Sequence, residues 1–517
     1  MNKLHVKAVA CIEIGSNGTR MHISQWDGNN IVSLDRLERT THMGQEVFAT
    51  GYISFETIRE LSGILEGFCA VAREYQVTRI YTVATTALRE AVNKAYVLDH
   101  IAIQNGLEVQ VLEDSQANVF LFSAMEERRG NSKGTELMVF GGTGTIDFAL
   151  RQNGKTLFTH SMHTGLIKIN QMLREASEFS SHTDLVAREY IQTFFARSNR
   201  MEDLLQAGSI VFGLGDMRPL LTIFEISAEG GELDRETILE TYETYHHLSL
   251  EQIAARHRLN MEQSGTVFAA LSLLAVLLES SAVKRVRFVQ VNLVDAMLSL
   301  YLRPDARREY NRELRESIRT SAVDLSRRYR CDLRHASQVS AHALTLYDKL
   351  RKLHGLSKRQ SLLLETACIL HECGQYTNTS DTQEASFDLV KDAQIYGLGS
   401  GETLLAANII SPQNLLGLSQ RRSRQQLLQD EDMMFAAKMH AILHLADALD
   451  FSHKQKAVIT GVEQKSETMT LEISVRIQEA FTLEQLMFRQ GAELFQEIFG
   501  LTPVLNIESI YQMGGRQ

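Results

Sequence analysis

The segment LMVFGGTGTIDFAL, from Leu137 to Leu150, places a glycine and threonine loop between two apolar runs. A loop of this kind suits a phosphate, because backbone N–H groups can reach phosphate oxygens only where side chains are small or absent. Phosphate hydrolysis also needs carboxylates that hold a metal ion or activate water. The sequence therefore predicts a phosphate-binding loop formed by Gly142, Thr143, Gly144 and Thr145.

A second loop of the same type precedes it in the chain. Aligned without a gap, the segments IGSNGTRMHISQWDGN and FGGTGTIDFALRQNGK match at a constant offset of 126 residues. The matched residues are Gly15, Gly18, Thr19 and Gly28, which fall on Gly141, Gly144, Thr145 and Gly154. Both copies read as a strand, a glycine loop, a second strand and a hairpin turn, which indicates an internal duplication. Two halves related by a pseudo-twofold axis would place their loops face to face. We therefore predict phosphate binding at Ser16, Asn17 and Gly18 as well.

Other residues near these loops are candidates for phosphate or nucleotide contact. Arg89, in TALREAVN, begins a helix after a strand, where the helix N-terminus favours anions and a guanidinium can clamp a phosphate bidentately. The alternative is a salt bridge to Glu90 or Glu113. Gly213 and Gly215, in FGLGDMRPL, either approach a nucleotide or phosphate chain or form an ordinary turn.

The second half of the chain contains a possible second metal site. His335, His371 and Asp447 follow the order of the ligands in HD-type metal phosphohydrolases, where imidazoles and carboxylates hold a metal that activates water. Glu372, however, replaces the aspartate that bridges metals there, and DTQEASFDLV lacks the further histidines of such sites. These departures favour a helical scaffold that keeps part of the residue set. Core or surface roles are expected for His342, His440, His444 and His453.

The elements that must position these residues change character along the chain. Strands alternate with helices over the first hundred residues, which is typical of an α/β layer architecture. The pattern predicts helices over 55–75 and 87–103. Beyond Pro304 the chain reads as helical, and the last sixty residues mix strands with a helix. We predict four units: 1–125, 126–303, 304–455 and 456–517.

Composition limits the classes of protein that fit. A chain of 517 residues is expected to hold several domains. It shows no signal peptide and no apolar run long enough to span a bilayer, so we expect a cytoplasmic protein without membrane association. The five cysteines lack the spacing of a disulfide framework and are expected as buried thiols. A net charge of -10 disfavours general nucleic-acid binding. The arginine-rich stretch 303–335 is either a solvated helical face with Glu–Arg pairs or a track for a polyanion.

Four segments together resemble a known family. CIEIGSNGTRMHIS, VATTALREAVN, FGGTGT and ILHLADALDFSHKQK are similar to the exopolyphosphatase and guanosine pentaphosphate phosphohydrolase (Ppx/GppA) family, in the same order over nearly the whole chain. The resemblance implies an α/β fold of duplicated actin-like (ribonuclease H-like) domains, then an all-α HD-like domain and a small α+β C-terminal domain. It also implies a homodimer that uses Mg²⁺ to release terminal phosphate from polyphosphate or guanosine pentaphosphate.

The chain departs from the family pattern at its carboxylates. Glu13 replaces the aspartate before the first loop and is expected to keep a metal role. Gln116 and Ala117 stand where the family has a glutamate pair, of which the second is the catalytic base. Val139 and Ile146 stand at the positions of an aspartate and a glutamate around the second loop.

Three neighbouring acids could replace the lost ones. Glu113 and Asp114 lie in a loop shortly before the missing base, where a shift of the chain costs little. Asp147 lies one residue beyond the lost glutamate. Because successive strand side chains point to opposite faces, we expect Asp147 to face away from the site.

Three functional hypotheses follow. The first is a weak Mg²⁺-dependent phosphohydrolase in which Glu113 or Asp114 activates water. The second is a catalytically silent protein that senses polyphosphate or a guanosine nucleotide, because the loops persist while acids are lost. The third is metal-dependent hydrolysis in the helical domain.

Overall fold

The computed structural model describes residues 8–129, 134–142, 145–153, 155–162, 164–177, 183–197, 205–215, 217–227, 230–303, 305–377, 380–412, 430–465 and 467–509. The chain divides into two compact units, Met1–Leu314 (unit 1) and Arg315–Gln517 (unit 2). The predicted division into four is finer than these two units and stays a prediction.

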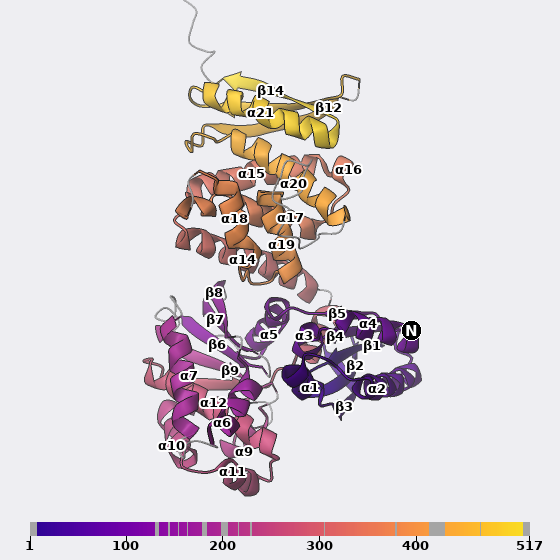
Figure 1. The fold of residues 1–517 in the computed structure, drawn as a ribbon, viewed down its shortest axis with the longest axis vertical. Helices are drawn as coiled ribbons and strands as arrows, with labels where there is room; N and C mark the ends of the chain where they lie inside the picture. Colours follow the sequence, from indigo (N-terminus) through magenta and orange to yellow (C-terminus); the bar gives the residue numbers. More distant parts are fainter. Residues whose placement is uncertain are drawn as a thin grey trace, which may run out of the picture. The chain divides into compact units, whose positions relative to one another are not determined.

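The first part of unit 1 is built on a five-stranded sheet with the order β3-β2-β1-β4-β5 (Figure 1). β1, β2 and β3 are antiparallel neighbours, whereas β4 and β5 continue the sheet in parallel from β1. The strands are β1 (Ala8–Ile14), β2 (Gly18–Trp26), β3 (Ile31–Thr40), β4 (Arg79–Ala84) and β5 (Val109–Val111). The helices are α1 (Met43–Thr50), α2 (Phe55–Glu74), α3 (Thr86–Glu90), α4 (Lys94–Asn105) and α5 (Asp114–Arg129). The predicted helix over 55–75 is confirmed as α2, which starts at the Ser54 cap and buries Leu65 and Phe68 in the core of this part.

The second part of unit 1 repeats this topology. Its six-stranded sheet has the order β8-β7-β6-β9-β11-β10, again with three antiparallel strands followed by two parallel ones, and β10 adds an antiparallel edge. The strands are β6 (Thr135–Gly141), β7 (Ile146–Gln152), β8 (Lys155–Met162), β9 (Ser209–Gly213), β10 (Gly230–Asp234) and β11 (Arg285–Val289). The helices are α6 (Leu166–Ser177), α7 (Thr183–Arg197), α9 (Pro219–Ile223), α10 (Arg235–Tyr245), α11 (Leu250–His257), α12 (Met261–Glu279) and α13 (Leu293–Leu302).

The duplication is therefore real, but the predicted offset of 126 residues is wrong by one. The first loop is closed by a hydrogen bond from the Gly15 N–H to the Gly18 carbonyl, at 2.9 Å. The same bond in the second loop runs from the Gly142 N–H to the Thr145 carbonyl, at 2.8 Å. Gly142 thus corresponds to Gly15, which makes the offset 127 (142 minus 15).

Steric contacts explain why the alignment matched Gly15 with Gly141 and not with Gly142. A Cβ atom on Gly15 or Gly142 would lie 3.0 Å from the carbonyl oxygen that closes its loop. Gly141 is required for a different reason, because a Cβ there would approach the Met217 side chain at 2.8 Å. Glycines at neighbouring positions thus serve different contacts, and their identity alone does not fix the alignment.

The predicted helix over 87–103 is interrupted in the structure. α3 ends at Ala91, which is extended, and α4 begins after Asn93. The Asn93 side chain bonds the backbone N–H and carbonyl of Ile53, and the Val92 N–H donates to the Gly51 carbonyl. These contacts with a neighbouring segment replace the helical hydrogen bonds and break the helix.

One helix of unit 1 has the length and hydropathy of a membrane span. This helix, α12, is 78% buried over its apolar window, and its side chains form the centre of the second core cluster. Burial by the surrounding elements explains why α12 is apolar on all sides.

Unit 2 combines helices with a small sheet. Its helices are α14 (Ala306–Arg328), which begins within unit 1, then α15 (Leu333–Lys349), α16 (Arg351–His354), α17 (Lys358–Leu370), the 3₁₀ turn η1 (Cys373–Tyr376), α18 (Thr382–Lys391), α19 (Ser400–Ile410) and α20 (Asp430–Ala448). A three-stranded sheet follows in the order β12-β13-β14. Its elements are β12 (Ala457–Lys465), β13 (Thr470–Ile477), α21 (Thr482–Phe499) and β14 (Thr502–Ser509).

The close packing of α1 on the first loop can be tested with two glycine substitutions. A Cβ on Gly44 would lie 2.6 Å from the Ser16 Cβ, so Gly44→Ala should lower the free energy of unfolding by about 1–3 kcal/mol. Gly63, in α2, has no atom within 4 Å of such a Cβ, so Gly63→Ala should raise it by about 0.5–1 kcal/mol. Urea denaturation measures both, and equal effects of the two substitutions would contradict this packing.

Candidate functional site

A cavity of about 90 Å³ in unit 1 is lined by residues that flank both glycine loops. Glu13 and Arg20 reach it from β1 and β2, and Gly142 and Thr145 reach it from the second loop. Helix α5 contributes Asp114, Ala117 and Asn118. Residues on either side of the first loop and residues of the second loop therefore face one space, but the predicted phosphate-binding residues Ser16, Asn17 and Gly18 are not part of its lining.

The register of the strands brings Asp147 into this cavity. Glu13 pairs with Arg20 across β1 and β2, and Phe140 pairs with Asp147 at the equivalent position across β6 and β7. All four residues line the cavity. Ile146, one residue earlier, points into the apolar core instead. The prediction that Asp147 faces away is therefore wrong: the alternation of side chains holds, but the cavity lies on the Asp147 face of the strand.

The Asp147 carboxyl is buried and held by hydroxyl groups. Its side chain accepts hydrogen bonds from Thr145 Oγ1 at 2.8 Å and Ser161 Oγ at 2.5 Å, and Asn118 adds a third. Burial is the largest influence and raises the pKa of Asp147 to about 7, with the negative charge of Asp114 adding to it. A carboxyl group with this pKa can exchange a proton with water near neutral pH.

The structure separates the two predicted catalytic acids, Glu113 and Asp114. Asp114 lines the cavity, whereas the Glu113 side chain is about one third exposed and lies 3.9 Å from Arg89. Arg89 donates to Asp114 at 2.7 Å and to the Leu112 carbonyl at 2.9 Å. Arg89 thus forms the predicted salt bridge to Glu113 and a shorter one to Asp114, and it holds the segment that leads into α5. A phosphate contact by Arg89 stays a prediction.

The residues of the first loop have different surroundings. The Ser16 side chain is buried, and its carbonyl accepts from the Gly44 N–H at 2.8 Å. Gly18 is the first residue of β2 and closes the loop through its carbonyl. Asn17 lines a second, larger cleft. In the second loop, Thr143 and Gly144 lie outside the described residues, so their predicted role is untested.

The larger cleft adjoins the cavity and has a volume of about 480 Å³. Arg20, Gly215 and Asn292 line both spaces. The cleft also holds Arg218, His22, Glu38 and Glu262, so its wall carries both charges. Its size is within the range of small-molecule sites. Gly215 therefore fits its predicted contact role, whereas Gly213 is packed, because a Cβ there would approach Met125 and Phe140 at 2.9 Å.

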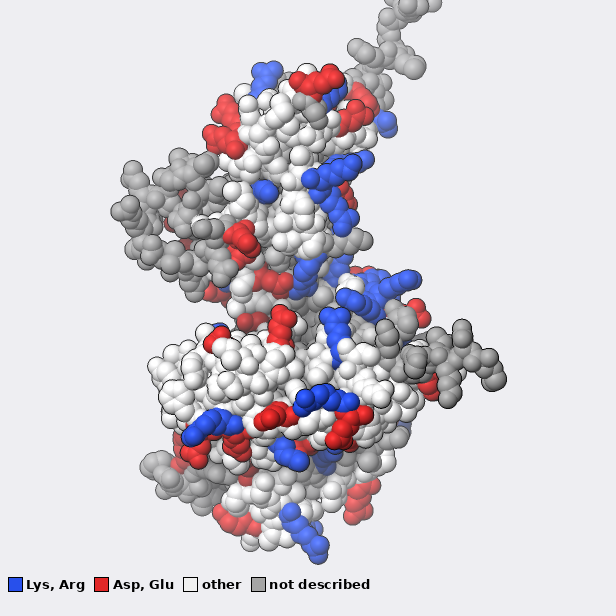
Figure 2. Space-filling model, turned by 90° about the vertical axis from the view of Figure 1, so that its right-hand side faces the viewer, with Lys and Arg blue, Asp and Glu red and all other residues white. Residues whose placement is uncertain are grey.

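The arginine-rich stretch forms helix α14. Its Arg315 and Arg319 lie 3.0 and 3.7 Å from the Glu365 carboxylate on α17, and Arg327 pairs with Asp324 at 3.1 Å. Figure 2 shows acidic and basic side chains next to one another over much of the face drawn. These pairs offset part of the positive charge of α14, but none of the three is a Glu–Arg pair within the helix, so both the solvated face and the polyanion track stay predictions.

In unit 2 the predicted residues His335, His371 and Asp447 come together. The His335 ring bonds Asp447 through Nε2 at 3.1 Å and Asp450 through Nδ1 at 3.0 Å. His371 Nε2 lies 3.4 Å from the same Asp447 oxygen. Burial opposes the charged form of His335, but the two carboxylates outweigh it and raise the pKa of His335 to about 10. The same contacts lower the pKa of Asp447.

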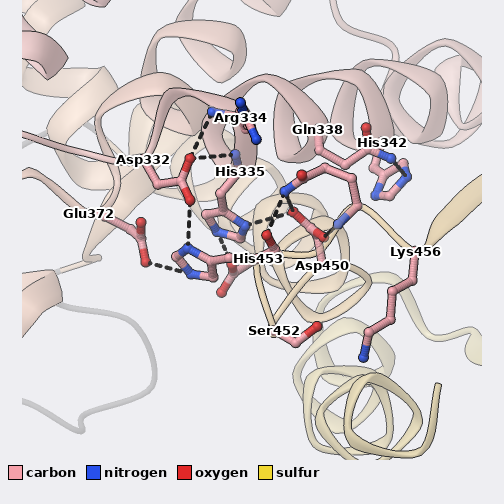
Figure 3. A network of polar contacts seen from close by, with 12 residues as sticks. Asp332, Arg334, His335, Gln338, His342, Glu372, Asp450, Ser452, His453 and Lys456 are labelled. Carbon is pink, nitrogen blue, oxygen red and sulfur yellow. Dashed lines mark hydrogen bonds and ion pairs between the residues drawn. The ribbon is translucent and has the colours of Figure 1, made fainter. Parts of the chain in front are cut away.

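His453 joins this group, although a core or surface role was expected for it. Its ring stacks on His335, with centroids 3.7 Å apart and planes within 3°. Figure 3 shows His453 between Glu372 and Asp332, at 3.3 and 3.4 Å. Glu372 thus pairs with His453 and does not belong to the group of His335, His371 and Asp447.

Comparison with known proteins identifies the chain. Residues 22–293 match the Ppx/GppA phosphatase family, and residues 318–490 match Ppx/GppA phosphatase, domain III. The chain belongs to the Ppx/GppA phosphatase family. A guanosine-5'-triphosphate,3'-diphosphate pyrophosphatase from Photobacterium profundum is 20% identical over 450 residues, which are 84% of each chain.

Two solved Ppx/GppA structures show the same fold. The Aquifex aeolicus family member is 19% identical with a TM-score of 0.50, and the match covers 57% of this chain and 98% of that one. An exopolyphosphatase from Cytophaga hutchinsonii ATCC 33406 is 15% identical with a TM-score of 0.51, over the same shares of each chain. The actin-like fold predicted for the first part is thus confirmed, and the HD-like assignment of the helical part stays a prediction.

Sequence reasoning missed Asn118 and Asp450, expected Asp147 to face away from the site and gave His453 no role in a site. Asp147 could have been found from the 127-residue offset, which pairs it with Arg20 of the first copy. Asn118 follows the lost base at Ala117 directly. Asp450 lies one helical turn after Asp447, a spacing that places both on one face. His453 carries no such signal.

The unusual pKa of Asp147 can be measured through stability. Between about pH 4 and pH 7 the folded chain keeps a proton on Asp147 that the unfolded chain has released, so the free energy of unfolding should fall as the pH rises, by up to about 4 kcal/mol. Urea denaturation across this range without Mg²⁺ should show a smaller decrease for Asp147→Asn. The exposed Asp99→Asn variant should keep the wild-type slope. Equal slopes in all three proteins would contradict the raised pKa.

Proposed function

We propose that this protein is a phosphohydrolase that removes terminal phosphate from polyphosphate or guanosine pentaphosphate, with Asp147 as the general base. The family consists of phosphatases, and the P. profundum relative is named for a guanosine nucleotide substrate. The observation that carries the proposal is the buried Asp147 carboxyl group in a cavity lined by Glu13 and Arg20 beside the first loop and by Gly142 and Thr145 of the second, where burial raises the pKa of Asp147 to about 7.

The reaction follows from the positions of these residues. The terminal phosphate would lie in the cavity, which Gly142 and Thr145 of the second loop line. Asp147 would take a proton from a water molecule while the oxygen of that water attacks the terminal phosphorus. The bond from this phosphorus to the bridging oxygen would break, and the remaining phosphate chain or nucleotide would leave. A base with a pKa near the working pH combines the deprotonated form with useful basicity. Arg20 would offset negative charge on the phosphate oxygens.

The acids of the cavity also fit Mg²⁺. This ion prefers oxygen ligands and is commonly bound by one or two carboxylates together with substrate phosphates. Glu13 and Asp114 both line the cavity and would hold it. When bound, the ion would stabilise charge on the phosphates. Asp147 stays available for proton transfer in this arrangement.

The adjoining cleft would bind the rest of the substrate. Its volume of about 480 Å³ exceeds that of the cavity at about 90 Å³, and Arg20 lines both. Arg20 and Arg218 suit phosphates, while Gln290 and Asn292 offer hydrogen bonds to a base or sugar. A chain of phosphates or a nucleotide would thus extend from the cavity into the cleft.

Phosphate release from polyphosphate and guanosine pentaphosphate, with Mg²⁺, tests the proposal. Asp147→Asn should lower kcat by about 10²–10⁴-fold, because it removes the base and keeps the side-chain shape. Asp99→Asn, exposed on α4, should release phosphate at the wild-type rate. Ala117→Glu in the Asp147→Asn background should restore turnover, since residue 117 lines the same cavity.

Two results would redirect the assignment. Loss of activity in Glu113→Gln with full activity in Asp147→Asn would return water activation to Glu113. Tight binding of either substrate by the wild-type protein without any release would instead establish the sensor hypothesis.

We also propose that unit 2 binds a divalent transition metal ion through His335, His371 and Asp447. A tetrahedral site with bonds of about 2.0–2.1 Å separates its ligand atoms by about 3.4 Å. The two Nε2 atoms lie 3.1 and 3.4 Å from Asp447 Oδ1, which is close to that spacing. The Asp447 side chain is 30% exposed, so solvent can reach this point.

The outer contacts of both histidines support this ligand set. His335 Nδ1 contacts Asp450 at 3.0 Å, and His371 Nδ1 contacts the Cys368 carbonyl at 2.8 Å. A metal-binding histidine commonly donates its second N–H to such a carboxylate or carbonyl, which directs the other nitrogen to the ion. Two imidazoles with one carboxylate favour Zn²⁺, Mn²⁺ or Fe²⁺ over Mg²⁺. Among the described residues, the clusters of three potential ligand atoms within 4.8 Å all include His335.

Titration of the metal-free full chain with Co²⁺, followed by visible absorption, tests this second site. The wild-type protein should take up one equivalent with the spectrum of a nitrogen-coordinated ion, and His371→Gln and Asp447→Asn should abolish it. Asp450→Asn should weaken binding roughly 10–100-fold through the outer contact. His444→Gln, on the same helix as Asp447, should bind normally. An unchanged spectrum in His371→Gln would refute the site and leave a protonated His335 between two carboxylates.

A further inference from the structure

Two of the five free cysteines lie against each other in unit 2. The Cys331 and Cys373 sulfur atoms are 3.1 Å apart. A disulfide bond measures about 2.05 Å, so a movement of about 1 Å would bring the two sulfurs to bonding distance. The spacing of the five cysteines matched no disulfide framework, so the sequence predicted only buried thiols. The contact joins residues 42 positions apart in the chain.

The two thiols differ in their access to solvent. Cys331 lies between α14 and α15 and is half-buried, whereas Cys373 begins η1 and is fully buried. A small oxidant can therefore reach Cys331 first, and Cys373 is placed to attack it afterwards. Cys368, by contrast, is buried and behaves as a small apolar residue of the core.

The thiol pair is directly connected to the histidine cluster. Cys331 precedes Asp332, and Cys373 follows Glu372. These two acids hold His453 from opposite sides, at 3.4 and 3.3 Å (Figure 3). A covalent link between the cysteines would therefore constrain both acids at once. No other pair of cysteines among the described residues is in sulfur–sulfur contact.

We propose that Cys331 and Cys373 form a reversible disulfide when the protein meets a low-molecular-weight disulfide such as glutathione disulfide. The Cys331 thiolate attacks one sulfur of glutathione disulfide, forms a mixed disulfide and releases one glutathione. Cys373 then loses its proton and attacks the Cys331 sulfur, which releases the second glutathione. Two electrons pass from the protein thiols to glutathione disulfide, and the two thiol protons end on the two released glutathione molecules.

The surroundings of Cys331 favour the first step. The two sulfur atoms share a hydrogen bond, and this contact lowers the pKa of Cys331 below its usual range against the opposing effect of burial. A lower pKa favours the thiolate, which is the nucleophilic form. Disulfides of this kind in a reducing compartment are commonly transient and redox-sensing.

The test uses the full chain, incubated with glutathione disulfide and then alkylated, digested and analysed by mass spectrometry. A peptide linked through Cys331 and Cys373 should appear, and dithiothreitol should remove it. Cys331→Ser should abolish the linked peptide, and Cys69→Ser, a half-buried cysteine of unit 1, should leave it unchanged. The oxidised wild-type protein should also unfold at a higher temperature, because the link closes a loop in the unfolded chain.

Three outcomes would overturn the proposal. The first is the absence of the linked peptide under conditions in which exposed thiols react. The second is a stable glutathione adduct on Cys331, which would show that Cys373 does not reach it. The third is equal linkage of Cys331 to other cysteines, which would show nonspecific oxidation. Because Cys331 is partly exposed, the Cys331→Ser variant keeps the test valid even where Cys373→Ser fails to fold.

Discussion

The site in unit 1 depends on two short hydrogen-bonded loops. Each is closed by a glycine N–H that donates to a carbonyl three residues later, at 2.9 Å after β1 and 2.8 Å after β6. This bond fixes the residue at which each antiparallel pair begins, and side chains alternate from that residue onward. The closure therefore decides that Arg20 and Asp147 point into the cavity, while Ile146 enters the core. A shift of one residue would exchange an acid for an isoleucine in the cavity.

The sequence was sufficient for the large features of the fold. Duplication and the alternation of strands and helices followed from glycine spacing and hydrophobic periodicity. The exact register did not, because neighbouring glycines satisfy different contacts: Gly142 allows the loop bond, and Gly141 allows Met217 to pack. The break between α3 and α4 was also hidden, since it arises from hydrogen bonds between Asn93 and Ile53, 40 residues earlier in the chain.

For the candidate sites, too, the sequence indicated which residues come together but not the contacts that they make with residues distant in the chain. The order of His335, His371 and Asp447 along the chain was enough to suggest that they meet. Their environment was not, because it depends on Asp450, which contacts the outer nitrogen of His335, and on His453, which stacks on its ring. These contacts explain how a fully buried imidazole can be tolerated there, since a buried charge needs compensating partners. Either a proton or a metal ion on the His335 Nε2 atom would meet that requirement.

In unit 1, the replaced acids and the altered pKa of Asp147 have a common physical basis. Ala117, Val139 and Ile146 add no charge, and Val139 and Ile146 are fully buried in the apolar core cluster of the second sheet. An acid that lies next to such a core is poorly hydrated, which raises its pKa, and Asp114 raises it further. A carboxylate that stays in contact with solvent does not lose its hydration in this way. Burial of a single acid is therefore a physically sufficient route to a proton acceptor in a cavity where the resemblance to the family predicts a glutamate at residue 117 and the chain has Ala117.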